Sequence, residues 1–223
     1  KCTTMLTLIQ TSQDRKIELE RFIHSLNSQQ DIDFNNLQLI FIDQGDNKTS
    51  FSKLNKNIKF TYIKYCQCSL SHARNIALKY VEGKYVGFPD DDCWYSPQTL
   101  KQVLYHFSNG RNGIIAKGVD ETGEMTNRFS SKSQEISLYN HCGAISYTIF
   151  LKFDPTLSFD ENIGVGSNLG FLSGEESDYL YHFLLQHSNV YYDKNIIVHH
   201  PLAKTDYFKN TLDKAYCYAK GYG

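Results

Sequence analysis

Short apolar segments alternate with amphipathic helical segments through the first half of the chain, and this alternation constrains the fold most. The apolar segments have the length and composition of buried strands and lie at residues 5–9, 37–42, 58–65 and 85–88. Between them, apolar residues recur at helical spacing, with Ser12 or Asp14 able to cap the first helix and Ser69 beginning the second. Because strand–helix–strand order requires crossover connections, we predict an α/β fold with a largely parallel sheet and helices on both faces.

The second half of the chain has a different pattern. Strands are expected at residues 114–115, 144–150, 190–193 and 196–198. A polar stretch over residues 120–140 is long enough for a functional loop. A helix with an acidic first turn is expected around Tyr179, and a last amphipathic helix from about Tyr207. Without an internal repeat or a linker, the sequence predicts one domain over residues 1–223.

Composition excludes several classes of protein. The formal net charge of −1 over 223 residues gives no global field for nucleic acid or for an anionic membrane. No apolar run approaches the ~20 residues of a spanning helix. The six cysteines are scattered without a C-x-x-C pair, so we interpret them as reduced thiols of a cytoplasmic protein. Neither G-x-G-x-x-G nor G-x-x-x-x-G-K-[ST] follows the first strand, which excludes a dinucleotide fingerprint and a P-loop.

Three consecutive aspartates, Asp90-Asp91-Asp92, end the apolar run that begins at Tyr85. They lie where a strand stops, the usual place for ligands in an open α/β sheet. Adjacent carboxylates repel one another unless a cation or solvent compensates, and a hard divalent ion with oxygen ligands would do so. A solvated acidic turn is the alternative, and the spacing alone does not decide between them.

Further polar groups stand at strand ends or helix starts. They are Asp43, Glu175-Glu176 with Asp178, and His199-His200. Carboxylates with an imidazole suit Mn²⁺ or Mg²⁺. Each group also has a plain structural explanation: a turn before Gly45 for Asp43, charge at a helix N-terminus for the glutamates, and an exposed strand end for the histidines.

The order of these motifs resembles the family 2 glycosyltransferases over nearly the whole chain. The resemblance rests on Ile42-Asp43-Gln44-Gly45, Ala73-Arg74-Asn75, the triple aspartate, Gly174-Glu175-Glu176 and a histidine near the end. It implies the GT-A fold, with a Rossmann-like, mostly parallel sheet flanked by helices and a small second antiparallel sheet. It also implies a nucleotide-sugar-binding half over about 1–110, an acceptor-binding half over about 111–205, and a C-terminal helix over about 206–223, truncated at Gly223.

The resemblance implies roles for individual residues. Thr11 and Asp43 would hold the nucleoside, with Asp43 accepting from the uracil imide, and Arg74 would contact the nucleotide or its phosphates. Asp90 and Asp92 would form the D-x-D metal motif with Asp91 near the ribose. One of His199 and His200 would complete the metal or diphosphate site. The family's base is an Asp where this chain has Glu176, so Glu175 and Asp178 stay open as alternatives for that role.

The function implied by this resemblance is metal-dependent, inverting transfer of a hexose-type sugar. The donor would be a nucleotide sugar, with a UDP-sugar expected, and the acceptor a glycan or lipid-linked hydroxyl in surface-polysaccharide synthesis. A lipid-linked acceptor would bring the protein to the inner face of the cell membrane. Two alternatives remain open at this point: a nucleotidyltransferase that makes nucleotide sugars, and a catalytically inactive nucleotide-sugar-binding module.

Overall fold

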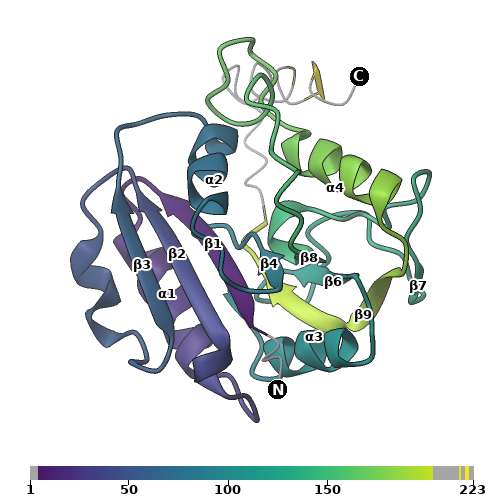
Figure 1. Ribbon diagram of the computed structural model, residues 1–223, viewed down its shortest axis with the longest axis horizontal. Helices are drawn as coiled ribbons and strands as arrows, with labels where there is room; N and C mark the ends of the chain where they lie inside the picture. The colour runs from purple at the N-terminus through teal and green to yellow at the C-terminus, as the bar shows by residue number, and fades with distance from the viewer. Residues whose placement is uncertain (1–4, 203–215, 217–218, 221–223) are drawn as a thin grey trace.

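A nine-stranded sheet runs through the described part of the chain in the computed structural model, in the order β3-β2-β1-β4-β8-β6-β9-β5, with β7 paired to β9 (Figure 1). The structure describes residues 5–202, 216 and 219–220. The strands are β1 (Leu6–Ser12), β2 (Leu37–Asp43), β3 (Lys59–Lys64), β4 (Tyr85–Gly87), β5 (Trp94–Tyr95), β6 (Gly113–Val119), β7 (Gln134–Glu135), β8 (Ile149–Lys152) and β9 (Val190–His199).

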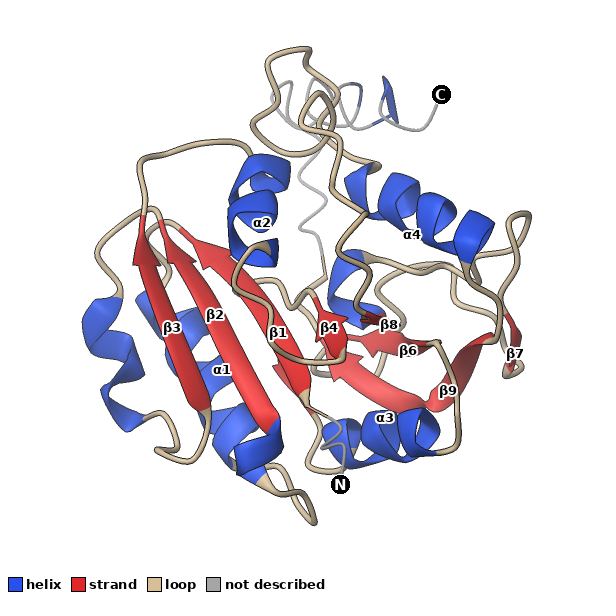
Figure 2. Cartoon of the chain, viewed as in Figure 1, coloured by secondary structure: helices blue, strands red, loops and turns tan. Residues whose placement is uncertain are grey.

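Helices connect and cover these strands (Figure 2). The α-helices are α1 (Lys16–Asn27), α2 (Leu70–Leu78), α3 (Thr99–Ser108) and α4 (Glu175–Gln186), and the short 3₁₀ turns are η1 (Phe34–Asn36), η2 (Lys48–Lys53) and η3 (Ser146–Thr148). The predicted last helix from about Tyr207 lies outside the described residues, apart from isolated positions.

The half of the sheet formed by β3, β2, β1 and β4 is parallel throughout. Beyond β4 the direction changes, because β8 pairs antiparallel with both β4 and β6. The expected α/β architecture with a mostly parallel sheet is confirmed. The antiparallel strands, expected as a small second sheet, instead continue the central one.

Two apolar cores lie on opposite faces of the sheet. Alternate residues of β2 divide between them, with Leu39 and Phe41 packing against α1 and Ile40 and Ile42 packing against α2. The same division places α3 in the first core and α4 in the second (Figure 1). Helices on both faces explain why β2 is buried along its whole length and reads as a continuous apolar run.

Several local predictions were wrong for physical reasons. Neither Ser12 nor Asp14 caps α1, because Arg15 is the N-cap residue and those side chains bond Asp91 and the backbone of Asp46 instead. Ile17, one of the apolar residues at helical spacing in this segment, is 82% exposed and does not belong to the buried face of α1.

The second half also differs in detail from the prediction. The segment predicted as a strand over residues 144–150 contains η3, and β8 begins only at Ile149. The two strands expected at residues 190–193 and 196–198 form the single strand β9, with an irregular register opposite Ile115–Lys117. The long polar segment after β6 contains the two-residue strand β7.

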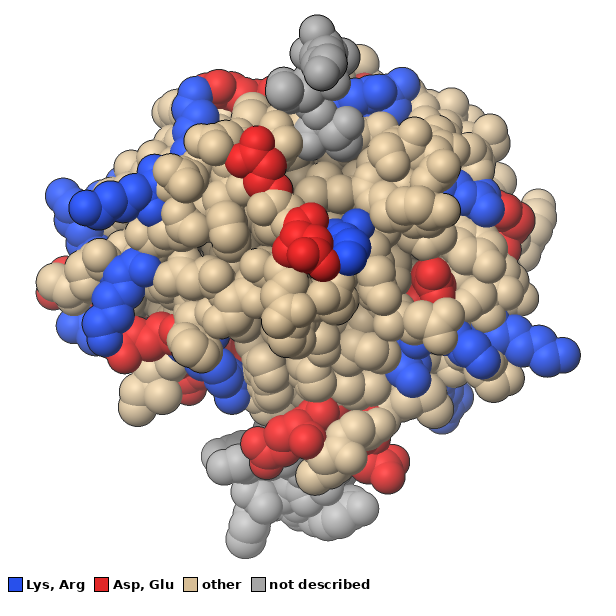
Figure 3. All heavy atoms as spheres, turned by 90° about the horizontal axis from the view of Figure 1, so that it is seen from below, with Lys and Arg blue, Asp and Glu red and all other residues tan. Residues whose placement is uncertain are grey.

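No helix among the described residues is long and apolar enough to cross a bilayer. Figure 3 shows Lys, Arg, Asp and Glu scattered over one face, including a basic and an acidic side chain close together near its middle. The cysteines of the described region (Cys66, Cys68, Cys93, Cys142) are free thiols, in line with the predicted reduced state.

Candidate active site

A cleft of about 1570 Å³ opens at the carboxyl ends of β1 and β4. Its walls come from segments far apart in the sequence: the ends of these strands, the start of α2, the first turn of α4, the glycine-bearing loop over residues 161–173, and residues 200–202. Parallel strands deliver their carboxyl ends to one edge of the sheet, which is why polar residues from distant motifs meet there.

The turn after β4 carries the three aspartates into this cleft. Ser12 Oγ donates to Asp91 Oδ2 at 2.6 Å, and Arg15 Nη1 lies 2.6 Å from Asp92 Oδ2. The other oxygen of that carboxylate, Asp92 Oδ1, lies 2.9 Å from His200 Nε2. Both oxygens of Asp92 are therefore engaged by basic groups.

Charges within this turn shift its pKa values in opposite directions. Burial, reinforced by the neighbouring Asp92 and Asp90, raises the pKa of Asp91 to about 6. Burial would also raise the pKa of Asp92, but His200 and Arg15 outweigh it and hold that pKa below its usual range. Asp91 therefore keeps its proton to a higher pH than Asp92 does.

Arg74 links the two acidic groups of the cleft. Its guanidinium is 1% exposed, with Nη2 3.1 Å from Asp90 Oδ1 and Nη1 3.3 Å from Glu175 Oε1. Ser146 Oγ also donates to Asp90 Oδ1 at 2.9 Å. Arg74 therefore connects the aspartate turn to the N-terminus of α4 from within the protein.

Glu175 and Glu176 open α4 after Gly174, which adopts a left-handed conformation with φ of 98°. Both glutamates are buried and line the cleft. Burial, and after it the charge of Glu175, raises the pKa of Glu176 to about 8, although its own backbone N–H and the charge of Arg74 act in the opposite direction. Asp178 lies outside the cleft lining, with Oδ1 3.4 Å from His182 Nε2.

Asp43 ends β2 in an enclosed turn rather than in the cleft. Its carboxylate accepts from Tyr62 Oη at 2.5 Å, from the backbone N–H groups of Gly45 and Asn47, and from Asn47 Nδ2. Burial alone would raise the pKa of Asp43, but these donors outweigh it and lower the pKa. The side chain of Asp43 is 0% exposed and is not part of the cleft lining.

The next residue, Gln44, does line the cleft together with Thr11. Gln44 Nε2 donates to Thr11 Oγ1 at 3.2 Å, and Gln44 Oε1 accepts from the backbone N–H of Cys68 at 2.7 Å. These two bonds fix the orientation of the amide. Oxygen and nitrogen each keep capacity for one further hydrogen bond toward the cleft.

The two predicted histidines occupy different surroundings. His199, the last residue of β9, stacks on Trp94 with ring centroids 5.1 Å apart and lies 2.9 Å from Ser96 Oγ through Nε2. His200 lines the cleft and stacks on Tyr147 with centroids 4.5 Å apart. Burial would lower the pKa of His200, but Asp92 raises it. Only the second histidine meets the aspartates.

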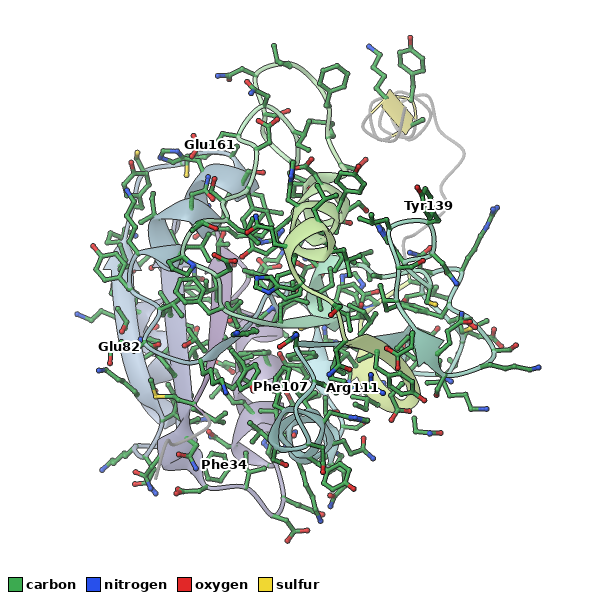
Figure 4. All side chains as sticks on the ribbon, turned by 45° about the vertical axis from the view of Figure 1, so that its right-hand side comes forward. Phe34, Glu82, Phe107, Arg111, Tyr139 and Glu161 are labelled. Carbon is green, nitrogen blue, oxygen red and sulfur yellow. The ribbon has the colours of Figure 1, made fainter. Side chains whose placement is uncertain are left out.

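The loop opposite the strand ends is fastened to α2. His72 Nδ1 lies 2.8 Å from Glu161 Oε2, and Asn75 Nδ2 donates to Glu161 Oε1 at 2.9 Å. Ser71 Oγ donates to the Ile163 carbonyl at 2.7 Å. A side chain at Gly164, where φ is 100°, would approach Ser71 and Glu175, so glycine is needed there. Figure 4 shows Glu161 beside the start of α2, far from Tyr139 at the opposite edge.

The donor set of the cleft matches a hard divalent cation. Carboxylate oxygens of Asp90 and Asp92 face the imidazole of His200, at 4.0 Å and 2.9 Å from Nε2. Burial is the largest cause of the raised pKa of Asp91, with Asp92 and Asp90 adding to it, and a bound cation would favour the ionised form. Within the described residues, however, no three acidic, His or Cys side chains already form a group that could hold an ion.

The sequence interpretation missed several cleft residues. Arg15, Ser12 and Ser146 all contact the aspartate turn, and Gln44 was noted only as a neighbour of Asp43. A basic residue just before a helix gives no distinctive signal, and Ser146 follows a polar loop of no clear pattern. Gln44 was the easiest of these residues to predict from the sequence, because it directly follows the aspartate that ends a strand.

Solved structures place this fold in a known class. The structure of S. aureus TarS 1-349 in complex with UDP-GlcNAc superposes with a TM-score of 0.72 at 17% identity, covering 91% of this chain and 60% of that one. Mannosyltransferase PcManGT from Pyrobaculum calidifontis, in complex with GDP-Man and Mn2+, gives a TM-score of 0.70 at 12% identity, covering 97% and 64%. The fold is that of the GT-A glycosyltransferases.

The sequence comparison is more specific. The model for "Glycosyl transferase family 2" matches residues 12–180, and the chain therefore belongs to glycosyl transferase family 2. It is 31% identical over 162 residues to the "Minor teichoic acid biosynthesis protein GgaB" of Bacillus subtilis (strain 168). That match covers 62% of this chain and 17% of GgaB, so the chain spans less than a fifth of that relative's length.

Proposed function

We propose that this chain is a metal-dependent, inverting glycosyltransferase domain that uses a nucleotide sugar, with a UDP-hexose as the expected donor. The observation that carries the proposal is that two carboxylate groups, Asp90–Asp92 and Glu175–Glu176, line one cleft and are joined through buried Arg74. An in-line displacement at an anomeric carbon needs charge compensation on the diphosphate side and a base on the opposite side.

The nucleoside is assigned to the ends of β1 and β2. Gln44 presents a fixed amide beside Thr11, with an acceptor for an imide N–H and a donor for a carbonyl of a base such as uracil. Asp43 acts through the turn that it holds, since its carboxylate is enclosed by four donors. Asp91 stays assigned near the ribose, where Ser12 orients it.

A divalent cation, Mn²⁺ or Mg²⁺, would be held by Asp92, Asp90 and His200. When bound, such an ion would neutralise the charge that develops on a leaving diphosphate. His199 is left out of this set because Trp94 and Ser96 occupy its ring. The Mn2+ of PcManGT supports a metal here only by analogy of fold.

Glu176 is the proposed base for the acceptor hydroxyl. Its raised pKa of about 8 gives the carboxylate more affinity for a proton than an ordinary glutamate has. Glu175 pairs with Arg74 and is assigned to hold that guanidinium, and Asp178 lies outside the cleft lining. A single base suffices for inversion, because no covalent intermediate has to be resolved.

The acceptor is assigned to the side of the cleft formed by residues 161–173. Similarity to GgaB supports a glycan or lipid-linked hydroxyl of a teichoic acid or another surface polysaccharide. Polymers of this kind are commonly begun on lipid carriers, so we propose work at the cytoplasmic face of the membrane.

Donor turnover with Mn²⁺ tests the proposal. Nucleotide sugars are screened for release of the nucleoside diphosphate, with and without an acceptor extract, in the wild-type chain and in Asp92→Ala. Release that requires both the metal and Asp92 supports transfer. Pyrophosphate release from a nucleoside triphosphate and a sugar 1-phosphate would instead reveal a nucleotidyltransferase, and metal-dependent UDP binding without any turnover would reveal an inactive binding module.

A further inference from the structure

Arg15 stands immediately before α1 and reaches across the mouth of the cleft to the aspartate turn. Its Nη1 atom lies 2.6 Å from Asp92 Oδ2 and 3.6 Å from Asp91 Oδ1. The side chain is 49% exposed, so solvent reaches the ion pair from one side. Arg15 is also part of the cleft lining. It is thus a cation placed on the carboxylate of Asp92 that the proposed function assigns to a metal.

A second arginine of the same helix shows what a structural role at this turn looks like. Arg21 Nη2 donates to the backbone carbonyl of Asp92 at 2.6 Å, and its guanidinium lies 3.9 Å above the ring of Trp94. Arg21 thus stabilises the turn through its backbone and through the neighbouring aromatic ring, and not through the aspartate carboxylates. Arg15 instead contacts only carboxylates among the interactions of its guanidinium that the structure gives, and does so from the solvent side.

The coordination of Asp92 makes the two cations competitors. Oδ1 of this carboxylate faces His200 and Oδ2 faces Arg15. A metal ion that approaches Asp92 from the cleft has to replace one of them. His200 is stacked on Tyr147 and only 24% exposed, whereas Arg15 is half-exposed. The group that can leave at the lower cost is therefore the arginine.

We propose that Arg15 is a built-in counter-ion that occupies Asp92 in the donor-free protein and moves to the diphosphate of the donor when metal and nucleotide bind. The proposal rests on the metal–diphosphate site of the proposed function. A guanidinium released into the cleft has the planar pair of donors that phosphate oxygens accept. Arg15 thereby opposes binding of the metal alone and favours binding of the metal together with a nucleoside diphosphate.

Calorimetric titration of the chain with Mn²⁺ alone tests the first half. Arg15→Gln is expected to bind Mn²⁺ about 1.5-fold to fivefold more tightly than wild type, the range for losing one partly exposed ion pair. Lys101→Gln is the matched control, because it removes the same charge from a surface pair with Asp31. The gain should vanish in Arg15→Gln combined with Asp92→Ala. Unchanged or weaker Mn²⁺ binding in Arg15→Gln, or no binding in either form, overturns the counter-ion role.

Titration with UDP at saturating Mn²⁺ tests the second half. Arg15→Gln is expected to weaken UDP binding by about 1.5-fold to fivefold, and Arg15→Lys to restore part of it. UDP binding that does not change in Arg15→Gln overturns the move to the diphosphate. These outcomes are distinct from failure of the proposed function, which would appear as UDP binding and turnover that ignore Mn²⁺ and Asp92 in every variant, wild type included.

Discussion

Two buried carboxylates, at the end of β2 and at the start of α4, have opposite electrostatic surroundings. Asp43 is enclosed by hydrogen-bond donors from Tyr62, Gly45 and Asn47, and its pKa lies below the usual range. Glu176 is buried beside Glu175, and its pKa is raised to about 8. Both side chains are buried, and burial is the largest cause that raises the pKa at each site; at Asp43 the hydrogen-bond donors outweigh it, whereas at Glu176 the charge of Glu175 adds to it.

This difference separates a structural acid from a reactive one. A carboxylate that its own turn satisfies holds the backbone in place and has nothing left to offer a ligand. A carboxylate beside a like charge binds a proton more readily near neutral pH, which is the property that a general base needs. Sequence position alone does not distinguish a structural role from a reactive one for these two residues. Asp43 is the last residue of β2 and Glu176 lies in the first turn of α4, and both kinds of position are common places for ligand-binding residues.

The largest expected effect comes from removing the reactive acid. Glu176→Gln should lower turnover by about 10²–10⁴, the usual contribution of a positioned base, and leave UDP binding unchanged. Kinetics with the screened donor and calorimetry with UDP measure both quantities. Asp178→Asn is the matched control in the same helical turn and should keep turnover. Activity that survives in Glu176→Gln but is lost in Glu175→Gln would assign the role to Glu175.

Removing the structural acid should act on folding instead. Asp43→Ala leaves the hydroxyl of Tyr62 and the donors of Asn47 without their partner, which should reduce the free energy of unfolding by about 3 kcal/mol. Urea denaturation measures this change. Asp46→Ala, in the exposed part of the same turn, should change the free energy by no more than about 0.5 kcal/mol. A stable Asp43→Ala with impaired UDP binding would contradict the comparison.

The pH dependence should report the raised pKa of Glu176. With a pKa of about 8 and an ionised base required, kcat/KM should fall about tenfold per pH unit below that value. Stability has the opposite sign: the folded pKa lies above the unfolded one, so the contribution is complete below about pH 4.5 and is lost as pH rises through about 8. As pH rises from about 4.5 to about 8, the melting temperature of Glu176→Gln should therefore increase relative to that of wild type. If the difference between the two melting temperatures does not change over this range, the pKa of Glu176 is not raised.

The smallest expected effect lies in one hydrogen bond. Tyr62→Phe removes the hydroxyl that donates to Asp43, and it should cost about 1 kcal/mol of stability while raising the pKa of Asp43. The same bond raises the pKa of Tyr62 to about 12, with burial as the larger cause, and this can be followed by ultraviolet titration. Tyr139→Phe, at a 98% exposed position, should leave stability unchanged.

The parallel half of the sheet was predicted well from the sequence, because β2 is a long apolar run and β4 is an apolar run that leads into three aspartates. The resemblance to the family also implied one site for the triple aspartate, the glutamate pair and one histidine, and in the structure these residues line one cleft. The sequence could not tell which of Asp43 and Gln44, or of His199 and His200, lines the cleft. Adjacent residues at a strand end point in different directions, and the direction depends on how the chain turns there. Contacts such as Arg74 to Glu175 join residues 101 positions apart and leave no local pattern.

The pairing of β5 with β9 holds Asp92, which lies just before β5, close to His200, which directly follows β9. Trp94 pairs with His199, and the backbone N–H of His200 donates to the Val119 carbonyl at 2.9 Å. The position of the His200 imidazole is thus set by the register of β5 and β9, because His200 directly follows the residue that pairs with Trp94. Inserting a single residue between Asp92 and Trp94 would turn every later side chain of β5 to the other face. The spacing between Asp92 and Trp94 therefore matters to the site independently of the side chains that occupy it.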